Sequence, residues 1–113
     1  MRISNFFKNN SFLLIILFIA FSNPVYSQKQ QATTYIIEIK KMKFIPDELI
    51  LNKGDTVIWI NKDFFLHDVT ELKKKEWSST EMQKGDSWKK VITKSANYYC
   101  SLHVVMKGNL VVK

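Results

Sequence analysis

The chain has 113 residues, 46% of them hydrophobic, and a formal net charge of +7. Its single cysteine excludes a disulfide bond within the chain, so a bound metal is the remaining source of extra stability for a small domain. The positive charge favours acidic partners and salt-sensitive association. The only basic run, residues 73–75, is interpreted as a solvated loop or as part of a docking surface.

Residues 1–27 have the pattern of a secretory signal peptide. Arg2 and Lys8 make the beginning basic, residues 12–21 are all apolar, and small residues precede a cleavage site before Gln28. An uncleaved membrane anchor is the alternative, but this apolar run is about half of the roughly 20 residues that a spanning helix needs. We therefore expect an exported protein, periplasmic or secreted, with a net charge of +7 − 2 = +5 after cleavage. Nucleic acid is a poor partner for it, because no arginine remains.

Residues 28–34 are polar without periodicity and are expected to form a disordered leader. One domain is expected at residues 35–113, where apolar and β-branched residues occur in short runs between turn residues. The runs that predict strands are 35–39, 44–51, 56–61, 68–72, 87–92, 96–100 and 109–112. The segments that predict turns are 52–55, 84–86 and 107–108. About seven short strands at regular spacing favour an antiparallel sandwich or barrel.

Some of these segments carry more specific expectations. Pro46 confines the first half of run 44–51 to a sheet edge or a bend. Run 56–61 is expected to be buried on both faces, whereas run 68–72 alternates between apolar and polar residues. Residues 76–83 have the weakest pattern, and one turn of helix is possible there.

Four side chains in the predicted domain suit a soft or borderline metal ion. Cys100, His103 and Met106 lie three residues apart on one loop, and His67 precedes the cysteine by 33 residues. Loops that meet at one end of a sandwich would bring all four together. Two imidazoles, a thiolate and a weak axial thioether are the ligands of blue-copper electron-transfer sites. The sequence therefore predicts one type 1 copper ion per chain, although zinc would accept the same donors.

Several longer segments resemble the cupredoxin family, in its plastocyanin-like form. They are the turn and strand at residues 53–63, the sequence His67-Asp68-Val69, the strand end 98–100, and residues 108–112. The resemblance covers residues 35–113. It implies a Greek-key β-sandwich of about seven to eight strands and a periplasmic one-electron carrier with type 1 copper. We expect a monomer.

Two features depart from the family pattern. Asp68 stands where such proteins often have an asparagine that ties the two ligand loops together, and it could still accept a hydrogen bond from Ser101. An ionised Asp68 near copper would stabilise the oxidised form and lower the reduction potential. Leu102 and Val104 stand where the family tends to have proline, so we expect a less rigid ligand loop.

The resemblance also implies where electrons enter and leave. The edge of His103 would face solvent, framed by Leu102, Val104 and Val105 as a docking patch. Residues 64–66 either join this patch or pack in the core. Weak redox encounters use small interfaces, and lysines around the patch would steer an acidic redox partner.

Two other functions remain as alternatives. A copper-binding module for delivery or storage would use the same ligands without a fast redox partner, but the chain has no accessory Met- or His-rich tract. An enzyme with a Cys–His nucleophile would need an oxyanion loop and an orienting third group, and no motif for either accompanies Cys100. We therefore expect a carrier and not an enzyme.

Overall fold

The computed structural model describes residues 23–26 and 30–113, and residues 31–113 form a compact unit of their own. Most of the predicted signal peptide, and the start of the predicted leader, lie outside the described residues. Among the described residues there is no helix of the length and apolar character needed to cross a membrane.

The domain is built entirely of strands in the part of the chain that the structure describes. The eight strands are β1 (Thr34–Lys40), β2 (Lys43–Ile45), β3 (Glu48–Leu51), β4 (Thr56–Asn61), β5 (Thr70–Glu71), β6 (Ser87–Val91), β7 (Ala96–Cys100) and β8 (His103–Val112). This confirms the predicted all-β class. The start of β1 corrects the predicted leader, because Thr34 already pairs with Thr56 and the Thr33 amide donates a hydrogen bond to Asp55.

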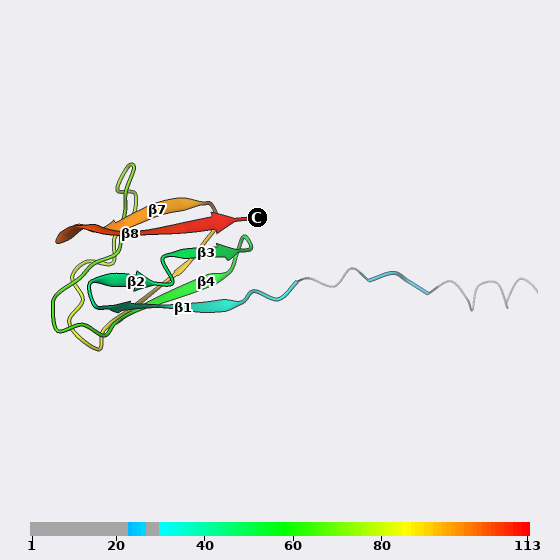
Figure 1. Ribbon diagram of the computed structural model, residues 1–113. Helices are drawn as coiled ribbons and strands as arrows, with labels where there is room; N and C mark the ends of the chain where they lie inside the picture. Colours follow the sequence, from blue (N-terminus) through cyan, green and yellow to red (C-terminus); the bar gives the residue numbers. More distant parts are fainter. Residues whose placement is uncertain (1–22, 27–29) are drawn as a thin grey trace, which may run out of the picture. The chain divides into compact units, whose positions relative to one another are not determined.

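The strands form two four-stranded sheets, with the orders β2-β1-β4-β6 and β3-β8-β7-β5 (Figure 1). The core between them contains side chains from both sheets. The sheets are mixed, because β1 runs parallel to β4 and β3 runs parallel to β8. The antiparallel pairing expected from the strand spacing therefore holds for the other strand pairs but not for these two. The chain repeatedly crosses between the sheets, so neighbouring strands are often not consecutive in sequence.

The predicted strand at residues 44–51 is two strands, one in each sheet. β2 lies at the edge of the first sheet, and β3 lies at the edge of the second. Pro46 stands between them, where its missing N–H interrupts no ladder of hydrogen bonds. The predicted edge or bend at this proline is confirmed.

The observed burial differs from the expectation in two of the predicted strands. In β4 the residues Val57, Trp59 and Asn61 are buried, but the residues between them are only half-buried, so this strand is fully buried on one face only. Residues 67–71 are all buried and do not alternate. Residues 78–82 pair with this segment through isolated bridges, and the helical turn considered possible at residues 76–83 is absent from the described residues.

Two of the three glycines lie in confirmed turns, and the third lies in a segment that was wrongly predicted to be a turn. Gly54 and Gly85 adopt positive φ values of 94° and 92° at the predicted turns. The predicted turn at residues 107–108 instead lies inside β8, where Gly108 pairs with Tyr98. A Cβ atom on Gly108 would lie only 2.1 Å from Cζ of Tyr98. This glycine therefore allows the tyrosine ring to cross the strand, and it does not reverse the chain.

The core is rich in aromatic side chains below the end of β7. Trp59 and Tyr98 are fully buried, and their ring centroids lie 5.5 Å apart in an edge-to-face arrangement. Trp88 packs on Trp59 at 5.4 Å. Burial raises the pKa of Tyr98 to about 12, so this phenol stays neutral at physiological pH. Cys100 follows Tyr98 by two residues on the same face of β7, so its position is fixed by this packed support.

Candidate metal centre

Cys100 and His103 lie at the two ends of a tight hairpin. They form a cross-strand pair between β7 and β8, with only Ser101 and Leu102 between them. The seven-residue loop expected from the sequence is therefore shorter, because β8 begins at His103. A hairpin of this kind fixes the separation of the two side chains through its backbone.

The pairing of β7 with β8 shifts register next to the cysteine. Tyr99 pairs with Lys107 whereas Cys100 pairs with His103, so residues 104–106 have no partner on β7. This bulge turns the side chain of Met106 inward, where it is 2% exposed in the cluster that also contains Cys100. Val104 and Val105 point outward and are 62% and 85% exposed.

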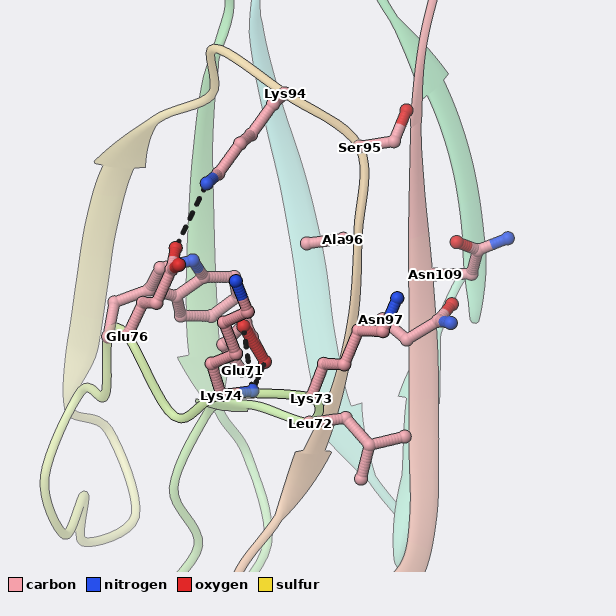
Figure 2. Close-up of a pocket in the computed structure, with 11 residues that line it drawn as sticks. Glu71, Leu72, Lys73, Lys74, Glu76, Lys94, Ser95, Ala96, Asn97 and Asn109 are labelled. Atoms are coloured by element: carbon pink, nitrogen blue, oxygen red, sulfur yellow. Dashed lines mark hydrogen bonds and ion pairs between the residues drawn. The ribbon is translucent and has the colours of Figure 1, made fainter.

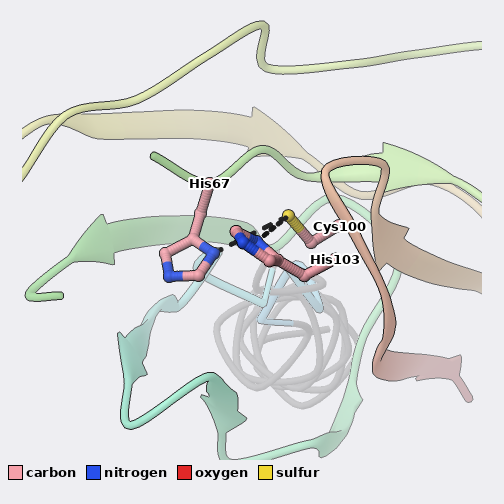
Figure 3. A group of neighbouring side chains, drawn as sticks. All are labelled: His67, Cys100 and His103. Atoms are coloured by element: carbon pink, nitrogen blue, oxygen red, sulfur yellow. Dashed lines mark hydrogen bonds between the residues drawn. The ribbon is translucent and has the colours of Figure 1, made fainter. Parts of the chain in front are cut away.

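His67, Cys100 and His103 converge although they come from two separate segments (Figure 3). The Nδ1 atoms of both histidines lie 3.7 Å from Sγ of Cys100, and the three ligand atoms are all within 4.8 Å of one another. A trigonal ion with bonds of about 2.0–2.3 Å would place nitrogen and sulfur ligands about 3.7 Å apart. The donor set therefore fits one copper ion. His67 and Cys100 are fully buried, and His103 is half-buried.

Asp63 holds the far side of the His67 ring. Nε2 of His67 donates to Oδ2 of Asp63 at 2.9 Å, which leaves the lone pair of Nδ1 free to face the thiolate. The Asp63 carboxylate also accepts hydrogen bonds from the amides of Lys41 and Met42, at 2.7 and 2.9 Å. Burial acts to raise the pKa of Asp63, but these two amides and His67 outweigh it and hold the pKa below its ordinary value.

Asn61 stabilises the segment that leads to His67. This buried side chain donates to the carbonyls of Phe65 and Met82, both at 2.9 Å, and accepts from the amide of Asp63. The backbones of His67 and Met82 exchange two further hydrogen bonds. Neither Asn61 nor Asp63 was predicted to be a site residue. The one available signal was a carboxylate four residues before the histidine.

Asp68 joins the two ligand segments as expected. Its carboxylate accepts hydrogen bonds from the Ser101 amide at 2.7 Å, from the Ser101 hydroxyl, and from the Thr70 hydroxyl at 3.1 Å. The Asp68 amide donates to Sγ of Cys100 at 3.4 Å. A donor to the sulfur stabilises negative charge on it. The hairpin and this link connect the ligand loop to its neighbours, and the lower rigidity expected from the missing prolines stays a prediction.

The family described as "Copper binding proteins, plastocyanin/azurin family" matches residues 31–113. The chain belongs to this family, and copper is its metal. Amicyanin from Paracoccus versutus is 26% identical over 96 residues, covering 80% of this chain and 73% of that protein. Amicyanin from Paracoccus denitrificans is 31% identical over 84 residues, covering 69% of this chain and 64% of that protein.

Solved structures agree with the fold. A reduced Cu(I) form of an amicyanin variant at pH 4 superposes with a TM-score of 0.65 at 28% identity, covering 77% of this chain and 87% of that one. A copper-containing nitrite reductase from Thermus scotoductus has a TM-score of 0.66 at 22% identity, and only 26% of that chain is covered. The second likeness shows the fold alone. Together these structures confirm the predicted cupredoxin sandwich.

Replacing Asp68 with asparagine should raise the reduction potential. The substitution keeps an acceptor for the Ser101 amide but removes a negative charge beside the copper ligands. Because this charge favours the oxidised metal, we expect an increase of about 60 mV, which is one factor of ten for a one-electron couple. Voltammetry of both copper-loaded proteins measures it. Glu48→Gln, at an exposed position on β3, is the charge-matched control. An unchanged potential in Asp68→Asn would show that this charge has no influence on the metal.

Proposed function

We propose that this protein is a one-electron carrier whose type 1 copper is held by His67, Cys100 and His103, with Met106 as the weak axial ligand. The observation that carries the proposal is the convergence of two imidazole Nδ1 atoms on one buried thiolate, each at 3.7 Å. Bound copper supplies a one-electron redox couple there. The chain offers a single site of this kind, which favours a carrier over an enzyme with several metal centres.

The surrounding residues favour fast transfer by limiting rearrangement. Asp63 fixes the orientation of His67, and Asp68 fixes the hairpin that presents Cys100 and His103. The buried side chains around the thiolate exclude water. A site held by its own hydrogen bonds needs little movement when its charge changes, because the ligands are already in place.

Electrons would enter and leave at His103. Its ring is half-buried and lies beside an exposed apolar patch that we call the docking patch. The patch consists of Phe64, Phe65, Leu66, Leu102, Val104 and Val105, each between 41% and 87% exposed. Residues 64–66 are thus at the surface and not in the core. The Phe65 ring lies 6.4 Å from that of His103, and Lys84 caps Phe64 at 3.6 Å. A redox protein with an apolar contact surface and acidic side chains would fit this patch, with the carrier acting as a monomer.

The signal-peptide pattern of residues 1–27 supports export, so the proposed location is the periplasm or the exterior of the cell. The mature chain would begin near Gln28.

Leu102→Lys should slow electron self-exchange by about tenfold while leaving the visible spectrum nearly unchanged. In self-exchange two docking patches must meet, and the added lysines would repel each other. NMR line broadening in mixtures of the Cu(I) and Cu(II) forms measures the rate. Ile50→Lys, at a 54% exposed position on β3, is the matched control. An equal slowing with the small neutral reductant hydroquinone would argue against a docking role.

The reduction potential, measured by voltammetry, and the retention of bound copper together test the proposed function. A carrier should give a reversible one-electron wave and keep its copper during dialysis against a chelator. Copper that is lost readily, with no reversible wave, would instead favour delivery or storage.

A further inference from the structure

A groove separate from the copper ligands lies beside β7. Its walls come from the segment after β5, from the turn between β6 and β7, and from β8 (Figure 2). The cavity has a volume of about 490 Å³. Its lining includes Lys73, Lys74, Trp77, Lys94, Asn97 and Asn109.

The groove carries an excess of positive charge. Glu71 and Glu76 are its two carboxylates, and both are engaged: Glu71 accepts the Lys74 amide at 2.9 and 3.1 Å, and Glu76 pairs with Lys94 at 3.0 Å. Lys94 and the neighbouring lysines hold the pKa of Glu76 below its ordinary value. Among the described residues, the ammonium groups of Lys73 and Lys74 have no carboxylate within 4 Å.

Apolar and amide groups give the groove features beyond charge. Trp77 is half-buried, and the Lys90 ammonium lies 5.4 Å from its ring centroid. Asn97 and Asn109 are cross-strand partners on β7 and β8, and they offer amide donors on the opposite side. The neighbouring surface contains the carboxylates of Asp47 and Glu48, so the excess of positive charge does not extend beyond the two asparagines. These groups define a short basic channel with one aromatic wall.

We propose that this groove, formed by Lys73, Lys74, Glu76 and Trp77 with Lys94, Asn97 and Asn109, binds an acidic segment of a partner protein. Side-chain carboxylates of the segment would pair with the ammonium groups of Lys73 and Lys74, and the asparagine amides would donate to the same oxygens or to the peptide backbone. An apolar residue of the segment would pack on Trp77. Binding here requires no copper, so the inference goes beyond the proposed electron carrier and does not depend on it.

Titration with a fluorescein-labelled decaglutamate peptide tests the proposal, using the copper-loaded and the metal-free protein. We expect saturable binding at low salt in both forms, and shifts of the Trp77 indole and Asn97 amide signals in NMR spectra. The double variant Lys73→Gln/Lys74→Gln should weaken binding by about tenfold, because exposed ion pairs make modest contributions that salt screens.

The double variant Lys40→Gln/Lys43→Gln is the control, since it removes the same charge from exposed positions on β1 and β2. We expect it to change affinity by less than about twofold. Equal weakening by both variants would overturn the proposal, because binding would then follow net charge alone. Binding to phosphatidylglycerol vesicles through Lys73 and Lys74, with no peptide binding, would also overturn it in favour of a membrane surface.

Discussion

Copper affinity is expected to fall by about ten- to a hundredfold when Asp63 is replaced by alanine. Groups that hydrogen-bond to a metal-binding histidine typically contribute this much, because they fix its orientation and tautomer. Asp63 is the hydrogen-bond partner of Nε2 of His67, and the Lys41 and Met42 amides hold the carboxylate in place. Competition titrations with a copper chelator would measure the loss.

The matched control for this substitution is Asp55→Ala. Asp55 also accepts two backbone hydrogen bonds, from Thr33 and Asn52, but it touches no copper ligand. We expect Asp55→Ala to lower stability and leave copper affinity nearly unchanged. Asp63→Asn keeps the size of the side chain and should fall between the wild type and Asp63→Ala. If both alanine variants reduced copper affinity equally, the effect would come from general loosening of the fold and not from the His67 contact.

Gly108→Ala is expected to destabilise the domain by about 3 kcal/mol, the upper end of the range for overpacking a core. The new methyl group would lie within 2.1–2.5 Å of three atoms of the Tyr98 side chain, so the ring or the strand must move. A loss of this size lowers the melting temperature of a small domain by roughly 12–24 °C. Thermal unfolding of the metal-free protein would measure it without a contribution from copper.

A double-mutant cycle identifies the cause of this loss. In a Tyr98→Leu background the ring that meets the new methyl group is absent, so Gly108→Ala should cost much less. If the cost were the same in both backgrounds, the close approach of Tyr98 would not explain the glycine. An alanine accepted at position 108 without loss of stability would contradict the described register of β7 and β8.

The copper ligands were predictable because their signal is mostly local. Cys100, His103 and Met106 lie within seven residues, and the chain has only one other histidine. The link between Asp68 and Ser101 was also predictable, because each residue directly follows a ligand. The length of the strand after the cysteine was not predictable, since it depends on the register shift that leaves residues 104–106 unpaired.

The site residues that were not predicted from the sequence act through contacts that are distant in the chain. Asp63 binds the amides of residues 41 and 42, and Asn61 binds the carbonyl of Met82, so both roles require the folded chain. The predicted turn at Gly108 was wrong, because the need for a glycine opposite Tyr98 appears only when β7 and β8 are in register. Similarly, the apolar and polar alternation at residues 68–72 did not predict an exposed face, because residues 78–82 pair with this segment in the folded chain.

The central claim is that Cys100 is the thiolate ligand of a type 1 copper ion. Visible absorption and electron paramagnetic resonance spectra test it most directly. The copper-loaded chain from Gln28 should be measured beside its Cys100→Ser variant. We predict intense blue or green thiolate-to-copper absorption with narrow copper hyperfine splitting, both lost in the variant. A colourless copper-loaded protein, or a spectrum that does not change when Cys100 is replaced, would contradict this account.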